Sequence, residues 1–317
     1  MKEFLKKVPT PICGAMLGVL GLGNLIADYS TSMHDLCCII GLVLLAIILL
    51  KLFFHPKVII NELKTPTIAS VSGTFAMSLI ILSSYIAPSS RSIGCCLWIF
   101  SVLLFIALII YFTKEFIIKL NLENVYACYY IVYIGIVIAS VTAPLFNQNI
   151  IGEIIVCFGA LSFVFLLPLT MYRYLKLDTP DGFKPFICIN AAPFSLILLG
   201  YLNSFSKFSF EFVAFMFVAA TIFWVFSIAK VIEYRKLQFY PSVSAFGFPF
   251  VVAALCTKAT TKYFASTGID LPALNVLMWI EIAVATILVA YVLYSYIKFL
   301  IMPQNTSFNF FAEINNF

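Results

Sequence analysis

The chain is built from long apolar runs that alternate with short polar breaks. Ten runs reach the roughly 20 residues, at about 1.5 Å per residue, that a helix needs to cross a bilayer core about 30 Å thick. They lie at about 9–27, 36–54, 65–88, 93–118, 125–146, 148–175, 184–204, 206–237, 241–264 and 269–301. The pattern predicts an all-α polytopic membrane protein, with a ten-helix transmembrane pore domain over residues 1–301 and a short cytoplasmic C-terminal tail over 302–317.

The ten predicted helices form a repeat of five helical hairpins. The odd-numbered runs begin near residues 9, 65, 125, 184 and 241, so the spacings are 56, 60, 59 and 57 residues. Of the 28 glycines and prolines, 17 fall in odd-numbered runs, 6 in even-numbered runs and 5 in loops. Proline removes a helical hydrogen bond, which lipid tolerates poorly unless protein or water satisfies the freed carbonyl. We therefore expect five kinked odd-numbered helices to line a central pore, ringed by five smoother helices.

Glycines and prolines of the odd-numbered runs mark the expected pore wall. Small residues let helix backbones approach closely, as in Gly14-x-x-x-Gly18 of the first run. The alternative is a solid bundle in which these residues only permit tight packing. The candidate pore-lining and kink positions are Pro11, Gly14, Gly18, Gly135, Pro144, Pro193, Gly247 and Pro249.

Composition agrees with a membrane protein and sets its expected orientation. Hydrophobic residues make up 63% of the 317 residues and charged residues only 10%, whereas soluble domains carry about 25% charged residues. With the N-terminus inside, 15 of the 19 Lys and Arg residues fall on the cytoplasmic side, as the positive-inside rule favours. We expect a multi-pass protein of the plasma membrane, embedded in the lipid bilayer, with both termini cytoplasmic and no organelle-targeting extension. The net charge of +5 then reflects topology, and no nucleic-acid partner is expected.

Motifs for catalysis, metal binding and nucleotide hydrolysis are missing from the sequence. The two histidines, His34 and His55, fall in loops on opposite sides of the membrane under this topology. The nine cysteines lie within or at the ends of spans without a CxxC pair, and we expect them to be apolar packing residues. No GxxxxGK[ST] or GxGxxG string occurs. The expectation is no enzyme activity, no cofactor and no metal site; a membrane enzyme and an accessory subunit without its own flux are the alternatives.

Three charged residues inside the predicted spans bear on mechanism. Glu281 lies about twelve residues into the last run, near mid-membrane, as a structural group at a helix or subunit interface or as a possible coupling carboxylate for protons. Lys258 and Lys262 lie toward the outer end of the ninth run, where they either attract anions or snorkel as ordinary interfacial lysines. The centres of the odd-numbered runs carry no charge, so a pore there would close by dewetting or by a side-chain plug.

Four strings, all in odd-numbered runs, are similar to motifs of a known family. They read VPTPICGAMLGVLGLGN over 8–24, YIGIVIASVTAP over 133–144, KPFICINAAPFSL over 184–196 and AFGFPF over 245–250. The strings resemble the first, fifth, seventh and ninth helices of the tellurite-resistance/dicarboxylate transporter family, which includes the plant guard-cell slow anion channels. The resemblance covers residues 1 to about 301.

The resemblance implies a pore lined by the odd-numbered helices, usually in a homotrimer with one pore per protomer. It also implies a phenylalanine plug in the ninth helix just before a proline, and this motif maps to Phe248 before Pro249. Phe246 competes for the role, but it lies about 200° away around the helix, so only one of the two can face the pore. Lys262, about 21 Å farther along the axis, returns close to the face of Phe248.

These observations predict a gated anion channel that passes small inorganic or organic anions, such as chloride or nitrate, with Phe248 as the pore gate. Members of the family differ in cargo, so a second hypothesis stays open. In that hypothesis the protein is a proton-coupled carrier or exporter of dicarboxylate, sulfite or tellurite-type anions, and Glu281 is its coupling group.

Overall fold

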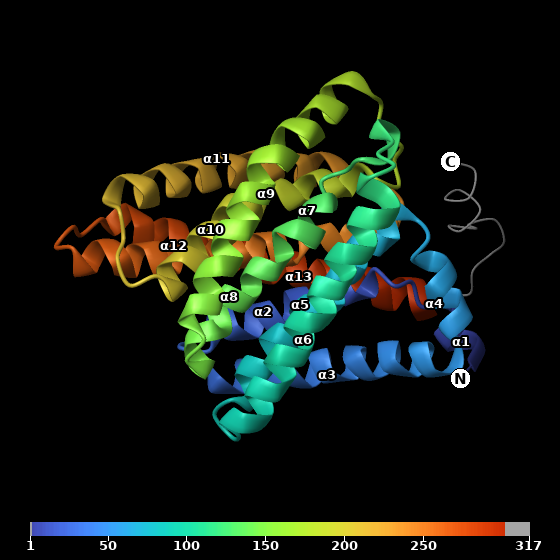
Figure 1. Cartoon of the computed structure of the whole chain (residues 1–317), viewed down its shortest axis with the longest axis horizontal. Helices are drawn as coiled ribbons and strands as arrows, with labels where there is room; N and C mark the ends of the chain where they lie inside the picture. Colours follow the sequence, from blue (N-terminus) through green and yellow to red (C-terminus); the bar gives the residue numbers. More distant parts are fainter. Residues whose placement is uncertain (1, 302–317) are drawn as a thin grey trace.

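The computed structural model describes residues 2–301, and the regular structure of these residues is entirely helical (Figure 1). An outer set comprises α3 (Thr31–Phe54), α6 (Arg91–Phe112) continued by the π-helix η1 (Thr113–Ile117), α9 (Asn149–Lys176), α11 (Phe210–Tyr234) and α13 (Pro272–Ile301). An inner set consists of five segments. The first two are the helices α2 (Ile12–Ile26) and α5 (Pro66–Ile86), and the next is the series α7 (Tyr129–Tyr133), η3 (Gly135–Val137), α8 (Ile138–Thr142) and η4 (Ala143–Phe146). The last two are η5 (Lys184–Ala191) with α10 (Pro193–Ser204), and η6 (Pro241–Phe246) with α12 (Phe248–Ser266). The short helix α1 (Lys2–Lys7) precedes these segments, and the short helices α4 (Pro56–Glu62) and η2 (Leu122–Asn124) connect an outer helix to the next inner segment.

The predicted multi-pass helical architecture is confirmed. Eight helical stretches of the described chain are long and apolar enough to cross a membrane, and they match eight of the predicted runs. Two shorter apolar stretches, Ile12–Ile26 and Gly135–Phe146, stand in place of the first and fifth runs. The count of ten crossings stays a prediction, and the predicted tail over 302–317 lies outside the described residues.

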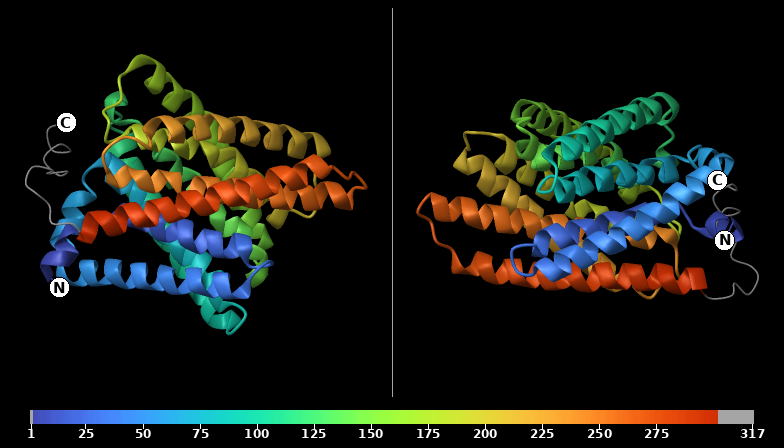
Figure 2. Two further views of the ribbon diagram at one scale, coloured as in Figure 1. Left: turned by 180° about the vertical axis from the view of Figure 1, so that it is seen from behind. Right: turned by 90° about the horizontal axis from the view of Figure 1, so that it is seen from below.

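Burial separates the inner helices from the outer ones as the glycine and proline distribution predicts. In the inner spans Pro66–Ile86, Lys184–Ser204 and Pro241–Ser266, 78% to 83% of the residues in the apolar stretch are buried, against 22% to 39% in the five outer spans. Every residue of α2 except Asn24 and Ile26 is buried as well, because α2 packs between α3, α5 and α12. The outer helices α3 and α13 lie on the outside of the bundle in both views of Figure 2.

The inner segments are interrupted where prolines or close packing demand it. Pro193 starts α10 after the 3-10 helix η5, and Pro249 follows the break between η6 and α12. The fifth segment is divided into four short helices although its first half has no proline. There Gly135 starts η3, and a Cβ atom at this glycine would stand 2.9 Å from the sulfur of Met77. The Met77 side chain therefore packs directly against the backbone of Gly135 at this break.

The inner helices of the first and third predicted runs, α2 and α5, differ from the expected kinked form. Both α2 and α5 are continuous α-helices. Pro9 and Pro11 precede α2, and Pro66 occupies the first turn of α5, where the missing N–H and fixed φ of proline are tolerated. Their prolines therefore set where the helices begin instead of bending them.

Serine side chains start three of the outer helices. The hydroxyl oxygens of Ser30, Ser90 and Ser209 accept hydrogen bonds from the backbone N–H groups of Met33, Ile93 and Phe212. A serine in this position satisfies one of the free donors of a helix N-terminus. The short turns that precede α3, α6 and α11 are thereby fixed.

A buried ion pair anchors the turn that precedes α2. Lys51, at the end of α3, is 0% exposed, and its ammonium lies 2.8 Å from Oε1 and 2.9 Å from Oε2 of Glu62. The same ammonium donates to the carbonyl of Val8 at 2.8 Å, and the hydroxyl of Thr10 donates to Glu62. All the hydrogen-bonding partners of this lysine are therefore inside the protein. The pair fixes the entry of the chain into the first inner helix.

Candidate functional site

A cavity of about 50 Å³ lies at the centre of the inner helices, and all five inner segments contribute to its wall. From α2 come Gly14 and Leu17; from α5 Val71, Thr74 and Met77; from the fifth segment Tyr130, Ile131, Ile134 and Gly135; from the seventh Phe186, Ile189, Ala192, Pro193 and Leu196; and from the ninth Ser244, Ala245, Phe248 and Pro249. The volume is enough for a few water molecules but not for an ion with its hydration shell.

The wall of the central cavity is neutral and mostly apolar. None of the residues that line it is charged. Its few polar groups are satisfied locally: the Thr74 hydroxyl donates to the Val71 carbonyl at 2.7 Å, and the Tyr130 hydroxyl shares a hydrogen bond with Thr170. An ion that entered would find few groups to replace its water, so the cavity is a barrier to ions in this conformation.

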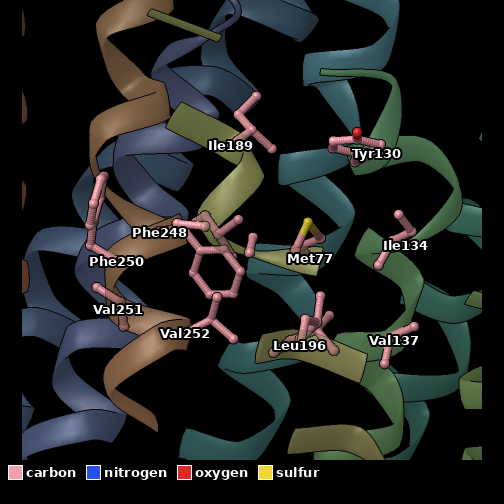
Figure 3. Packing of buried hydrophobic residues seen from close by; sticks show 14 of the residues in the cluster. Met77, Tyr130, Ile134, Val137, Ile189, Leu196, Phe248, Phe250, Val251 and Val252 are labelled. Atoms are coloured by element: carbon pink, nitrogen blue, oxygen red, sulfur yellow. The ribbon is translucent and has the colours of Figure 1, made fainter. Parts of the chain in front are cut away.

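The ring of Phe248 projects into this cavity from the first residue of α12. Phe248 is 5% exposed and lies just after the break at Gly247. Figure 3 shows its ring among Met77, Leu196 and Val252, whereas Phe250 points the other way. Phe246 does not line the cavity and stacks on Tyr291, with ring centroids 6.5 Å apart. Of the two phenylalanines that compete in the sequence, the structure places Phe248 in the cavity.

Two glycines of α2, Gly18 and Gly21, pack against Phe248. A Cβ atom at Gly21 would stand 3.2 Å from both Cδ2 and Cε2 of Phe248, which is closer than ordinary van der Waals contact. At Gly18 a Cβ atom would stand 3.4 Å from the Phe248 nitrogen and 3.5 Å from the Gly247 Cα. A side chain at Gly21 would therefore press on the Phe248 ring, whereas a Cβ atom at Gly18 would make ordinary van der Waals contact with the backbone of α12.

The other candidate pore residues fall into two groups. Gly14, Gly135, Pro193 and Pro249 line the cavity. Four others lie away from it: Gly18 and Gly247 pack against each other behind the Phe248 ring, Pro11 is the N-cap residue of α2, and Pro144 lies in η4. The structure thus brings half of the eight candidates to the cavity.

The lysines expected at the outer mouth lie near the end of α12, opposite the end that carries α1. The Lys258 ammonium lies 2.9 Å from Oδ2 of Asp28 and donates to the Leu25 carbonyl at 3.2 Å. Lys262 is exposed, and among the described residues no carboxylate pairs with it within 4 Å. The hydrogen bond from Lys258 holds the pKa of Asp28 below its usual value, so this carboxylate keeps its charge, and the pair persists, into mildly acidic solution.

Glu281 lies between an outer helix and an inner helix, away from the cavity wall. It is 2% exposed on α13, beside Thr257 of α12, whose hydroxyl hydrogen-bonds to its carboxyl group. Its second oxygen, Oε2, has no hydrogen-bond partner in the described chain. The interface is therefore within one protomer, and the carboxyl group does not touch the central cavity.

Most of the residues that line the central cavity could not be identified from the sequence. Leu17, Thr74, Met77, Ile189 and Leu196 are ordinary apolar or small polar residues of helices that are apolar on every side. Such helices have no polar face that distinguishes the cavity side from the packing side. Spacing from the recognised residues could have found some of them, since Leu17 is three residues after Gly14.

Comparison with known proteins agrees with this geometry. Residues 8–297 match the family described as voltage-dependent anion channel, SLAC1. An uncharacterized transporter of Methanocaldococcus jannaschii is 24% identical over 306 residues, which cover 85% of this chain and 90% of that protein. The family match spans every helix from α2 onward almost to the end of α13, so the resemblance seen in the four sequence strings is confirmed. The chain therefore belongs to the voltage-dependent anion channel (SLAC1) family, which points to a channel or transporter.

Proposed function

We propose that the protein is a gated anion channel in which the central cavity is the closed part of the conduction path and Phe248 is the gate. The observation that supports this most strongly is the cavity itself, because all five inner segments line it, no charged residue faces it and the Phe248 ring forms part of its wall. An apolar throat of this size excludes a hydrated ion until the plug moves. Rotation about the side-chain torsions of Phe248 would open it at a modest conformational cost.

Selectivity for anions follows in this proposal from fixed charge near the path. Lys258 and Lys262 lie on α12 beyond Phe248, and the cavity wall offers no carboxylate that would attract a cation. Asp28 neutralises much of the charge of Lys258, which leaves Lys262 as the stronger attractor. A net positive potential at a pore mouth raises the local concentration of anions.

This arrangement predicts the effect of removing the Asp28 charge. In a background with the gate opened by Phe248→Ala, Asp28→Asn frees the Lys258 ammonium and should raise chloride entry from that side by about twofold at low salt. The gain should vanish near 1 M salt, where the Debye length is about 3 Å. Chloride flux at two ionic strengths checks this. Equal chloride flux at low salt in Phe248→Ala and in the double variant Phe248→Ala with Asp28→Asn would show that the Lys258 charge does not affect chloride in the conduction path.

The finer features of the proposal rest on the resemblance and the arrangement of the chain ends. We propose a homotrimer in the plasma membrane that passes chloride, nitrate or similar anions, with both termini cytoplasmic. In Figure 2, α1 and the last turn of α13 lie at the same end of the molecule, as an even number of crossings requires. Lys6, Lys7 and Lys298 belong to these two helices, which supports a cytoplasmic assignment of this end.

The experiment that tests a channel is anion flux in proteoliposomes with and without a pH gradient. A channel dissipates a chloride or nitrate gradient at a rate set by the membrane potential and indifferent to the pH gradient. Accumulation of chloride or malate against its gradient, driven by protons, would contradict the proposal and favour the proton-coupled carrier or exporter of dicarboxylate, sulfite or tellurite-type anions.

Glu281 is the observation that favours the carrier, because its buried Oε2 atom lacks a partner among the described residues. Glu281 is not among the residues that line the central cavity, which argues against a role in transport. We expect Glu281→Gln, which keeps the shape and removes the charge, to leave passive flux unchanged within about twofold, as an uncoupled structural group would. Glu153→Gln on α9 is the matched control. Loss of a proton-driven component in the first variant alone would assign the coupling role to Glu281.

A further inference from the structure

A second cavity, of about 430 Å³, lies next to the central cavity at the end of the molecule that carries α1. We call it the inner vestibule, the space between Thr67, Tyr126, Arg173 and Phe183. Three inner segments line both cavities with residues three or four positions apart, which is about one helical turn: Thr67 and Val71, Tyr126 and Tyr130, Phe183 and Phe186. The inner vestibule therefore continues the axis of the central cavity. In Figure 1 the C-terminal end of α9, which supplies Arg173, lies beside the turn that leads to α7.

Arg173 carries a buried positive charge at this vestibule. It is 2% exposed, and its guanidinium carbon lies 4.3 Å from the ring centroid of Tyr126. Its Nη atoms donate only to neutral groups, the carbonyls of Leu177, Asp178 and Glu123 and the hydroxyls of Thr179 and Tyr126. In residues 2–301 no carboxylate forms an ion pair with it, and its Nε has no acceptor. A buried charge without a counter-ion is unfavourable, so this one attracts an anion.

The N-terminus of α5 faces the same vestibule without a cap. Thr65, its N-cap residue, makes no capping hydrogen bond with its side chain, and Thr65, Pro66 and Thr67 all line the vestibule. The first amide groups of a helix have no partner inside the helix, and the dipole of this 21-residue helix places positive potential there. Independently, the hydroxyl of Thr67 is buried and has no hydrogen-bond partner in the described chain.

We propose that the inner vestibule binds a small monovalent anion of the chloride or nitrate class between the first turn of α5 and Arg173. The Thr67 hydroxyl and the free amides of α5 are its hydrogen-bond donors, and Arg173 supplies the charge through space. Three exposed charges also line the vestibule, those of Lys64, Glu123 and Asp178. Because the two carboxylates outnumber the lysine at this rim, a dianion is less favoured than a monoanion.

This site deepens the proposed function, since it would concentrate the permeating anion about one helical turn away from the central cavity. Binding can nevertheless be measured without conduction. Chloride is titrated into the purified full-length protein in detergent, and the excess ³⁵Cl NMR linewidth reports bound chloride. Nitrate and sulfate serve as competitors. The variants are Thr67→Val, Arg173→Gln and Arg173→Lys, with Thr221→Val on α11 and the exposed Arg235→Gln as matched controls.

We expect saturable chloride binding that nitrate displaces more readily than sulfate. Thr67→Val and Arg173→Gln should each weaken it by about tenfold or more, as loss of a charged hydrogen bond or of the charge itself implies, whereas both controls bind like the wild type. If Arg173→Gln does not fold, Thr67→Val and Arg173→Lys decide. Unchanged binding in Thr67→Val, no saturable binding in the wild type, or preferential displacement by sulfate would each overturn the proposal. If the protein binds no chloride but Phe248→Ala shows raised chloride flux, the site is rejected and the channel stands. If chloride binds but Phe248→Ala shows no raised flux, the channel is rejected and the site stands.

Discussion

Replacing Phe248 by alanine should raise chloride and nitrate flux by about tenfold or more, because each 1.4 kcal/mol removed from a barrier is about a factor of ten in rate. The ring lies between the five inner segments and leaves a cavity of only about 50 Å³ beside it. Truncation to Cβ would widen that cavity and admit water, which removes the apolar constriction that keeps ions out. Flux of radioactive chloride into proteoliposomes measures the change.

Phe250→Ala is the matched control for this variant. Phe250 lies two residues farther along α12, is 0% exposed and points away from the cavity (Figure 3). Either substitution removes a buried ring, which in protein cores costs about 3–5 kcal/mol of stability. Both variants should therefore lose stability, but only Phe248→Ala should gain flux. Equal gains in both would point to a loosened bundle and not to a gate.

The second large effect concerns stability and comes from the buried pair of Lys51 and Glu62. Lys51→Met leaves the Glu62 carboxylate buried beside Thr10 without its cation. Breaking a buried pair in this way is expected to cost about 3–5 kcal/mol of unfolding free energy. Thermal unfolding of the detergent-solubilised protein, followed by the loss of monodisperse material, should shift to lower temperature.

Two further variants separate the pair from a general effect of lysine removal. Lys57→Met on the exposed face of α4 should leave the unfolding temperature unchanged. The double variant Lys51→Met with Glu62→Leu should recover most of the loss, because apolar residues often replace a buried ion pair with little net effect. A double variant as unstable as Lys51→Met would show that the hydrogen bonds to Val8 and Thr10, and not the charge pair, hold this turn.

The sequence predicts the helices well and their internal breaks less well. Long apolar runs are a strong signal because a bilayer fixes their length, and the third predicted run, 65–88, differs from α5 by only one or two residues at each end. The start of the second helix at Thr31 instead of residue 36 follows from the Ser30 cap, which hydropathy does not register. The division of the fifth segment depends on the packing of Gly135 against Met77, a contact between residues 58 positions apart that one sequence cannot reveal.

The candidate site shows the same limit. Phe248 could be singled out because it stands in a short motif before a proline, and the structure places it in the cavity. The pairing of Lys258 with Asp28 joins residues 230 positions apart, and that of Lys51 with Glu62 depends on how α3 and α4 fold back on one another. The sequence indicates Arg173 only as a cytoplasmic positive charge. Its burial and its neutral partners depend on the turn after α9. The string Thr179-Pro180-Asp181-Gly182 indicates a turn there, but it does not indicate which carbonyl groups the turn brings to Arg173.

The claim that ions pass through the central cavity is tested most directly by a cysteine placed on its wall. Thr74 lines the cavity from α5, and the native Cys157, exposed on α9, serves as an internal control. In the double variant Phe248→Ala with Thr74→Cys, a small anionic methanethiosulfonate should block most of the chloride flux, whereas Phe248→Ala alone should be insensitive to it. Undiminished flux after complete labelling of the introduced thiol would mean that anions do not pass through the cavity that the five inner segments enclose.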